Sequence, residues 1–493
     1  MIHVHAGVEK NIKNVVVSSL FFIIISSFLL ALSFNFSNLS LLSWFSLVFF
    51  LYVIEKENFK KGLFFSFLFG FSYSILIFFW IGNVSIAGLF ALVFYLCIYS
   101  ILFFIFSFYF FKKPLFILTI PSIWVILEFL RENIWCGFGW PNLGYTQYKN
   151  LYINQVADIF GVKFISFLIV MSNTVIYDFI FKKRSLKKLF IFFLIIIFCI
   201  IYSLYKLNYL KEDSYIKVLI VQPNFSKILK EEKPGKNFIL YTLKEMISKT
   251  DNSSLVILPE SSWPHIVDEQ EIFNLNSFVN DIKRDILIGA IRKEKDNFYN
   301  SCFYFGKDTK LLGIYDKIKL VPFGEYVPLR NFLTFIEVLN SIGDIQRGKN
   351  NKKFIYKDKF FSIIICFEDI FPNFVSELTK DIDFLVNITD DSWFGGNPEA
   401  RQHLAILVFR AIENRISIVR CANSGISGVV MFNGRYNILK NRDKEVYFRD
   451  IFKTSIPIKR EKTFYRRFKD IFCLFSFILI SINMITQIKH RLK

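Results

Sequence analysis

The distribution of apolar residues constrains this chain more than any other feature of its sequence. Apolar runs fill about the first 200 residues and return only at the C-terminal end. A helix that crosses a lipid bilayer needs about 20 predominantly apolar residues. Eight runs approach this length: 15–34, 36–54, 63–81, 86–111, 115–130, 156–181, 189–207 and 471–488. The sequence therefore predicts an α-helical transmembrane bundle of about eight spans, seven N-terminal and one C-terminal.

The connectors between these runs predict how the chain crosses the membrane. Clusters of lysine and arginine alternate along the chain with short, nearly uncharged connectors such as 83–85. Basic residues concentrate on the cytoplasmic side of membrane proteins. We therefore expect cytoplasmic N- and C-termini and an exported segment between the seventh and eighth spans. The basic stretch 459–469 lies on the opposite side, but long exported segments largely escape this rule.

This pattern divides the chain into three parts: a transmembrane bundle (1–208), an extracytoplasmic domain (209–470) and a C-terminal transmembrane helix with its tail (471–493). Within the middle part, short β-rich runs alternate with helical stretches, which is typical of an α/β domain. The β-rich runs are 217–221, 255–258, 286–289, 361–366, 384–387, 417–420 and 428–432, and the helical stretches include 372–379 and 400–414.

Composition argues against several other classes of protein. Hydrophobic residues make up 53% of the chain, above the 45–50% of soluble globular proteins. The net charge of +19 comes without a nucleic-acid-binding motif, so we expect no nucleic-acid partner. The seven cysteines form no close pair, which disfavours a disulfide framework and leaves room for a single functional thiol. The five histidines lack metal-ligand spacing, so we expect no metal and no other cofactor, and a structural hydrogen-bonding role for His403.

Three segments of the α/β part each place a reactive side chain after a β-like run. Glu260 follows 256–259, Lys317 follows Tyr315-Asp316, and Cys366 follows 363–365. Functional groups of open α/β layers gather at the carboxyl ends of strands, so we expect these three to converge. A thiolate is a nucleophile, a carboxylate can take its proton, and an ammonium can stabilise an oxyanion. Together they predict acyl-transfer chemistry.

Each of these residues by itself also fits an ordinary role. Free cysteines are commonly buried in cores, a glutamate after proline can be a loop carboxylate, and an isolated lysine is usually solvated. The segment 366–369 argues against packing alone, because two carboxylates follow the thiol directly at the end of a buried run.

These segments resemble the Glu–Lys–Cys triad of the nitrilase, or carbon–nitrogen hydrolase, superfamily, and most closely its membrane-embedded branch, the apolipoprotein N-acyltransferases. The resemblance covers almost the whole chain. Its motifs are Leu258-Pro259-Glu260, Tyr299-Asn300-Ser301, Tyr315-Asp316-Lys317, 320–325, Cys366-Phe367-Glu368, 391–395, 402–403, 410–413 and 423–427, with Trp124, Glu128, Arg131 and 137–141 in the apolar half. Two positions depart from the family pattern: Phe367 replaces the usual Tyr, and Gly139-Trp140-Pro141 reorders Pro and Trp.

The resemblance implies an αββα sandwich for 209–470 and a position in the bacterial cytoplasmic (inner) membrane with this domain on the periplasmic side. It implies Glu260 as general base, Lys317 as stabiliser of the oxyanion, and Cys366 as nucleophile. Glu325 and Glu368 would support the site, with Phe367 beside the nucleophile.

The implied reaction moves an acyl chain from a phospholipid, through a cysteine thioester, to the N-terminal α-amine of the diacylglyceryl-cysteine of an apolipoprotein. The expected partners are therefore a phospholipid, a diacylated apolipoprotein and the bilayer, and we expect a monomer. Trp263, Trp393 and Trp140 are candidates for an acyl channel, although core packing or anchoring at the membrane interface explains Trp263 and Trp393 equally well.

Two other functions stay open at this point. A membrane-tethered amidase or nitrilase would hydrolyse a small C–N substrate in a pocket reached from water. A transporter or lipid-binding membrane protein would keep its function without Cys366.

Overall fold

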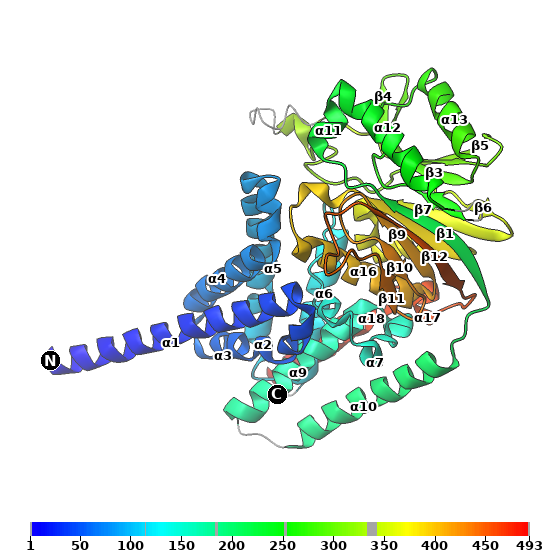
Figure 1. Cartoon of the computed structure of the whole chain (residues 1–493). Coiled ribbons are helices and arrows are strands. Elements are labelled where there is room, and N and C mark those ends of the chain that lie inside the picture. Colours follow the sequence, from blue (N-terminus) through cyan, green and yellow to red (C-terminus); the bar gives the residue numbers. More distant parts are fainter. Residues whose placement is uncertain (1, 114, 183–185, 251–253, 333–342, 492–493) are drawn as a thin grey trace. The chain divides into compact units, whose positions relative to one another are not determined.

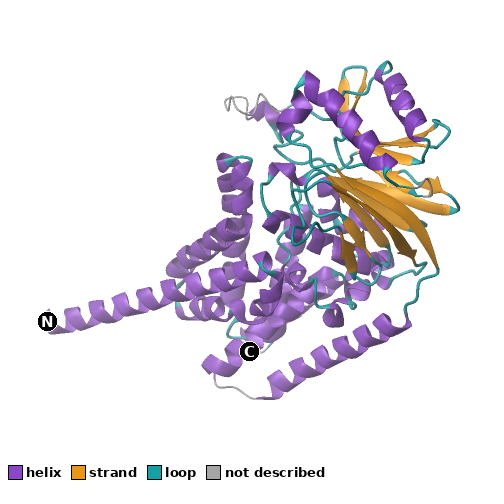
Figure 2. Cartoon of the chain, in the orientation of Figure 1, coloured by secondary structure: helices purple, strands orange, loops and turns teal. Residues whose placement is uncertain are grey.

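The structure, a computed structural model, describes all residues except 1, 114, 183–185, 251–253, 333–342 and 492–493. The chain divides into two units, residues 1–205 with 468–493 and residues 206–467. These divisions fall close to the predicted ends of the middle part. The C-terminal helix belongs to the same unit as the N-terminal helices. The strands that the structure describes, drawn as orange ribbons in Figure 2, all fall within residues 206–467, the second unit.

The first unit, here called the membrane unit, consists of helices and the loops between them over its described residues. Six helical segments are long and apolar enough to cross a membrane: Ser18–Asn35, Ser37–Lys56, Phe59–Asn83, Ile86–Phe110, Val162–Lys182 and Leu186–Tyr209. Its helices are α1 (Ile2–Asn35), α2 (Ser43–Ser46), α3 (Val48–Lys56), α4 (Phe59–Phe78), α5 (Ile86–Phe110), α6 (Phe116–Asn133), α7 (Leu151–Asn154), α8 (Ala157–Phe160), α9 (Val162–Lys182), α10 (Leu186–Tyr209, whose end crosses the boundary) and α18 (Ile471–Arg491).

The predicted fifth and eighth spans correspond to α6 and α18. Both are helical, but neither is among the six long apolar segments described, so a count of eight spans stays a prediction. α6 is less apolar because it includes Glu128, Arg131 and Glu132, all buried. The predicted second span is not one continuous α-helix, because it includes the separate helices α2 and α3. The helix of the predicted sixth span, α9, begins only after Gly161, whose positive φ of 72° ends α8.

Side-chain caps and buried charges fix the ends of the membrane helices. Asn58 accepts a hydrogen bond from the backbone N–H of Lys61 at the start of α4, and this satisfies a donor that the helix itself leaves free. Lys163 at the start of α9 forms ion pairs with Glu132 of α6 and with Asp470 just before α18 (3.1 Å). One buried ammonium therefore ties three helices together.

The second unit, here called the catalytic unit after the role that the resemblance implies for it, contains two six-stranded sheets. The strands of the first sheet are, in order, β12 (Asp450–Ile458), β1 (Ser214–Gln222), β2 (Leu255–Ile257), β3 (Ile286–Glu294), β4 (Asn297–Phe305) and β5 (Leu311–Asp316). Those of the second are β11 (Tyr436–Ile438), β10 (Gly428–Val430), β9 (Ser417–Ala422), β8 (Phe384–Thr389), β7 (Lys359–Ile365) and β6 (Phe354–Tyr356). The helices are α11 (Lys227–Glu231), α12 (Lys233–Ser248), α13 (Glu271–Ile282), α15 (Pro372–Leu378), α16 (Asn397–Asn414) and α17 (Phe464–Phe468).

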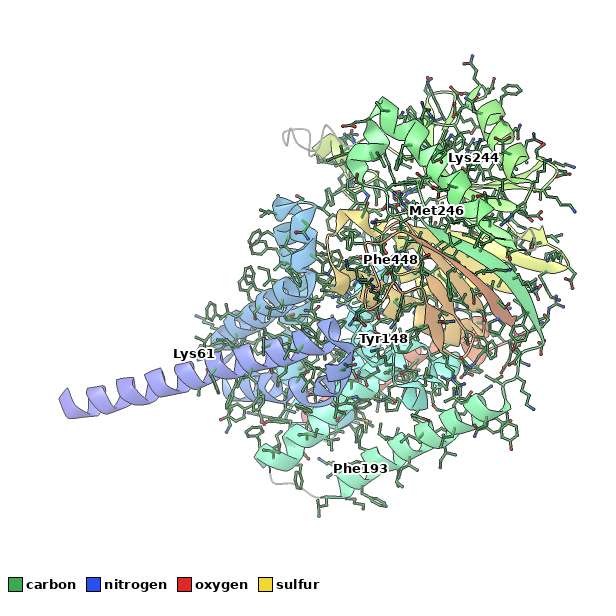
Figure 3. All side chains as sticks on the ribbon, in the orientation of Figure 1. Lys61, Tyr148, Phe193, Lys244, Met246 and Phe448 are labelled. Atoms are coloured by element: carbon green, nitrogen blue, oxygen red, sulfur yellow. The ribbon has the colours of Figure 1, made fainter. Side chains whose placement is uncertain are left out.

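Alternating side chains divide the interior of this unit into layers. Val218 of β1 joins Ile363 of β7 and Val386 of β8 in a core between the two sheets. Leu219, the next residue of β1, instead packs with residues of α12 and α13 on the outer face of the first sheet. Met246 of α12, labelled in Figure 3, belongs to this outer core.

The second sheet has its own helical cover. α16 contacts β9 and β10, and α15 packs against α16. Figure 1 shows α12 and α13 on one side of the paired sheets and α16 on the other. The catalytic unit is thus the αββα sandwich that the resemblance implied, and the seven predicted β-rich runs are confirmed as β1, β2, β3, β7, β8, β9 and β10.

Candidate active site

Glu260 is held by hydrogen bonds from two other segments of the catalytic unit. It follows the end of β2 and is 7% exposed. Its Oε1 accepts a hydrogen bond from Asn300 Nδ2 (2.7 Å), and its Oε2 accepts one from the backbone N–H of Asp390 (2.8 Å). Because both oxygens accept, the carboxylate has one orientation.

Lys317 lies between two carboxylates. It follows the end of β5 directly and is 1% exposed. Its Nζ lies 3.0 Å from Glu325 Oε1 and 3.5 Å from Glu260 Oε1. Asn300 Nδ2 also donates to Glu325 Oε1 (2.8 Å), so the amide and the ammonium both stand between the two acids. These donors hold two like charges close together in a buried place.

Cys366 has an unusual backbone conformation. It is the first residue after β7 and the first of the 3₁₀ helix Cys366–Ile370, with φ of 50°. Residues other than glycine rarely adopt this left-handed conformation, and such strained residues concentrate at functional sites. Its side chain is partly exposed, whereas Ile363 and Ile365 before it are fully buried.

The charges of this site act on one another. Burial and the carboxylate of Glu260 raise the pKa of the Cys366 thiol well above its ordinary value, against the lowering effect of Lys317. Burial also raises the pKa of Glu260, again opposed by Lys317. Burial would lower the pKa of Lys317, but Glu325 and Glu260 outweigh it and hold that pKa above its ordinary value. The structure therefore brings the three predicted residues together, with a neutral thiol and a charged ammonium.

Glu368 connects the turn of Cys366 to the loop of Lys317. Its Oε1 accepts hydrogen bonds from the backbone N–H groups of Ile318 (2.7 Å) and Lys319 (3.0 Å). Its Oε2 accepts one from the N–H of Ile365 (2.8 Å), and the hydroxyl of Tyr315 donates to both oxygens. Burial raises the pKa of Glu368 to about 7, although the backbone donors oppose this rise. The carboxylate of Glu368 thus connects, through hydrogen bonds, the loop after Lys317 and the turn at Cys366.

The aromatic candidates lie in different surroundings. Phe367 is buried and packs edge-on against Phe371. Trp263 is buried in the outer core beside α13, where its Nε1 donates to Glu271 Oε1 (3.0 Å), an arrangement that fits core packing. Trp393 is 49% exposed. Trp140 belongs to the membrane unit and packs against Trp80.

Sequence reasoning missed a second buried cluster of charges in the catalytic unit. Arg420 of β9 donates to Asp391 Oδ2 (2.8 Å) and to Asn387 Oδ1 (2.7 Å), and its Nη2 lies 2.8 Å from His403 Nδ1. The other ring nitrogen of His403 hydrogen-bonds Asp369 (3.0 Å), which matches the structural role expected of this histidine. The residue types of 391 and 403 were visible in the motifs, but nothing in the sequence paired them with an arginine on β9.

A metal is the other occupant that this cluster suggests. Ligand atoms of Asp391, Glu399 and His403 lie within 4.8 Å of one another and are buried. The guanidinium of Arg420, however, already donates to Asp391 and lies 2.8 Å from the Nδ1 atom with which His403 would bind an ion. The arginine thus supplies the positive charge that these acids need.

Two family models match the chain. The model of the apolipoprotein N-acyltransferase N-terminal domain matches residues 26–175, and that of carbon-nitrogen hydrolase matches residues 221–440. A Rickettsia prowazekii protein named apolipoprotein N-acyltransferase is 30% identical over 410 residues, covering 78% of this chain and 82% of that protein. The chain belongs to the apolipoprotein N-acyltransferase family.

Other matches extend over more of the sequence or over the α/β part. A Geobacter metallireducens protein of the same name is 29% identical over 484 residues, which are 91% of each chain. Among solved structures, Nit3 of Saccharomyces cerevisiae, a member of the nitrilase superfamily, is 18% identical, with a TM-score of 0.39, over 50% of this chain and 91% of that chain. Membership of the apolipoprotein N-acyltransferase family confirms the resemblance found in the sequence, and with it a membrane acyltransferase with a nitrilase-like unit.

Proposed function

We propose that this chain transfers an acyl chain from a phospholipid to the N-terminal α-amine of the diacylglyceryl-cysteine of an apolipoprotein, through a thioester on Cys366. The observation that supports this most is the arrangement of the buried Glu260 and Lys317 with the partly exposed Cys366 in a member of the apolipoprotein N-acyltransferase family. We propose the cytoplasmic (inner) membrane as its location, with the catalytic unit on the periplasmic side and both termini in the cytoplasm.

In the first half of the reaction, Glu260 acts as general base. The raised pKa of the Cys366 thiol means that it rests in its neutral form and needs a base. Glu260 takes the S–H proton as the sulfur attacks the ester carbonyl of the phospholipid. Lys317 and the backbone N–H of Phe367 stabilise the oxyanion that forms. Glu260 then returns the proton to the departing lysophospholipid alkoxide, which leaves a thioester.

In the second half, the α-amine of the apolipoprotein attacks the thioester carbonyl. Glu260 takes a proton from the attacking nitrogen and returns it to the departing Cys366 sulfur. An amide bond forms, a thioester breaks, and the enzyme returns to its starting state. The two halves share one base and one nucleophile, which predicts ping-pong kinetics.

The membrane helices explain why this chemistry occurs in a membrane protein. Both substrates are anchored by lipid chains, so an enzyme confined to the same bilayer meets them at higher effective concentration. Phe323, Leu329 and Trp393 are exposed apolar side chains near Glu325 and Asp390 in sequence, and they suit contact with acyl chains.

The test uses the full-length protein in mixed micelles, with phospholipid radiolabelled in its acyl chains and a synthetic diacylglyceryl-cysteine peptide. We expect labelled, N-acylated peptide from the wild type and from Cys136→Ser, a control variant in the membrane unit. We expect none from Cys366→Ser, and none when the α-amine of the peptide is acetylated beforehand.

Other outcomes would favour the other two functions. Labelled fatty acid that forms at the same rate with or without the peptide would indicate a hydrolase. Full transfer by Cys366→Ser would contradict a thioester mechanism. If neither the wild type nor any variant forms labelled peptide or labelled fatty acid, the result would favour a non-catalytic role in lipid binding or transport.

A further inference from the structure

Thr389 lies beside Cys366 because the two strands that end in these residues pair in parallel. Ile365, the last residue of β7, is in register with Ile388 of β8. The residues that follow this pair along the chain are Cys366 and Thr389. Thr389 is fully buried, and a hydrogen bond from its hydroxyl lowers the pKa of the Cys366 thiol. A buried hydroxyl of the neighbouring strand β8 thus lies beside the proposed nucleophile.

The same hydroxyl has a second partner. Thr389 Oγ1 donates to Asp391 Oδ1 at 2.7 Å, and Asp391 Oδ2 accepts from Arg420 Nη2 at 2.8 Å. Burial would raise the pKa of Asp391, but the Arg420 guanidinium, His403 and the Thr389 hydroxyl together outweigh it and hold that pKa below its ordinary range. An ionised carboxylate only accepts hydrogen bonds, so the proton of Thr389 points toward Asp391 while Cys366 is a neutral thiol.

A hydroxyl carries one proton and cannot donate to both acceptors at once. When Cys366 is a thiol, Thr389 donates to Asp391. When the proton has moved to Glu260, the sulfur is an anion in a buried place, and rotation about the Cβ–Oγ bond turns the hydroxyl toward it. Asp391 then retains its hydrogen bond from Arg420, so the rotation leaves no buried charge unpaired.

We propose that Thr389 is a catalytic residue, whose hydroxyl turns from Asp391 to the Cys366 sulfur and stabilises the thiolate during acyl transfer. The proposal rests on the proposed role of Cys366. Thr389 moves no proton between groups: the S–H proton goes to Glu260 and then to the leaving group, and the hydroxyl only changes its acceptor.

The test compares Thr389→Val, which has the same shape without the hydroxyl, with Thr389→Ser, which keeps the hydroxyl. Alkylation of Cys366 by iodoacetamide is followed by mass spectrometry in the full-length protein at several pH values from 7 to 9. Loss of one hydrogen bond to the thiolate raises the pKa of the thiol by about one unit. A higher pKa leaves less thiolate at each pH, which slows alkylation. The greater nucleophilicity of a more basic thiolate offsets only part of this loss. We therefore expect alkylation about three- to tenfold slower in Thr389→Val at every pH.

Acylation of Cys366 by radiolabelled phospholipid is measured in single turnover on the same proteins. We expect about tenfold slower acylation in Thr389→Val and rates within about threefold of wild type in Thr389→Ser. Thr389→Ala replaces the valine variant if valine prevents folding, as judged by the thermal unfolding midpoint.

Two results would overturn the proposal: rates of alkylation and acylation in Thr389→Val equal to those of wild type, or a serine variant as slow as the valine variant. Wild-type protein that takes up no label on Cys366 would instead contradict the proposed function, so the two failures are distinguishable.

Discussion

Gly289 lies directly against the backbone of Glu260. A Cβ atom at position 289 would stand 2.8 Å from the Cα of Glu260 and 2.3 Å from the carbonyl oxygen of Pro259. Gly289→Ala must therefore push the proposed base out of place, and displacement by about 1 Å can cost on the order of 100-fold in rate. We expect a loss of kcat/KM of that size in the peptide acylation assay.

Gly306→Ala is the matched control for this prediction. A Cβ there would come closest to the side-chain oxygen of Asp308, an exposed residue that can move, and would otherwise make an ordinary contact with Leu312 Cδ1 at 3.4 Å. We expect acylation close to wild type. Equal activity of the two variants would show that the position of Glu260 does not depend on Gly289.

Asn300 lowers the pKa of Glu260, the proposed base, through a side-chain amide that also donates to Glu325. Its hydrogen bond to Glu260 lowers the pKa of that carboxyl, so Asn300→Leu should raise it further. The base is then ionised only at higher pH, and the acidic limb of the kcat/KM profile should move upward by about one pH unit. A fall in kcat/KM by the same factor at every pH would mean that Asn300 acts on packing alone.

Glu368 makes the stability of the protein depend on pH. Its pKa in the folded protein is about 7, above the ordinary value near 4.5 of the unfolded chain, so between these values the folded state binds more protons. The contribution is complete below pH about 4.5 and is lost as pH rises through about 7. The thermal unfolding midpoint of the wild type should therefore fall, relative to Glu368→Gln, between pH 5 and pH 7.5.

The exposed Glu269 provides the comparison for this experiment. Glu269→Gln should follow the wild-type midpoint at every pH. A constant difference between wild type and Glu368→Gln across this range would contradict the raised pKa.

Lys163 compensates the buried carboxylate of Glu132 and the partly buried carboxylate of Asp470 in the membrane unit. Lys163→Met leaves Glu132 and Asp470 without their shared cation, and loss of one partner of a buried ion pair typically costs about 3–5 kcal/mol. We expect a lower thermal unfolding midpoint in detergent. The triple variant with Glu132→Gln and Asp470→Asn should recover most of the loss, because no unpaired charge is left. Failure of the triple variant to recover would indicate that packing, not charge, explains the loss.

The sequence predicted those elements whose signal is local. Long apolar runs identified most membrane helices, and continuous β-branched runs such as 363–365 identified the buried parallel strands. β4, β5, β6, β11 and β12 were missed, because aromatic and charged residues interrupt their alternation or because they are only three residues long.

The candidate site shows the same limit. Glu260, Lys317 and Cys366 could be singled out because each follows a strand-like run and together they suggest one chemistry. Arg420 and Thr389 could not, because their partners depend on the register of β7, β8 and β9. An arginine inside an apolar strand was visible in the sequence, and a buried charge of this kind requires a partner.

The proposed function depends most on an acyl-enzyme in which the acyl group is a thioester on Cys366. The measurement that tests it most directly incubates the full-length protein with acyl-radiolabelled phospholipid in the absence of acceptor, and then identifies the labelled peptide. We predict one acyl group on Cys366, released by hydroxylamine, absent from Cys366→Ser and discharged onto a diacylglyceryl-cysteine peptide with a free α-amine. Label on another residue, or label on Cys366 that the amine does not discharge, would contradict the proposed reaction.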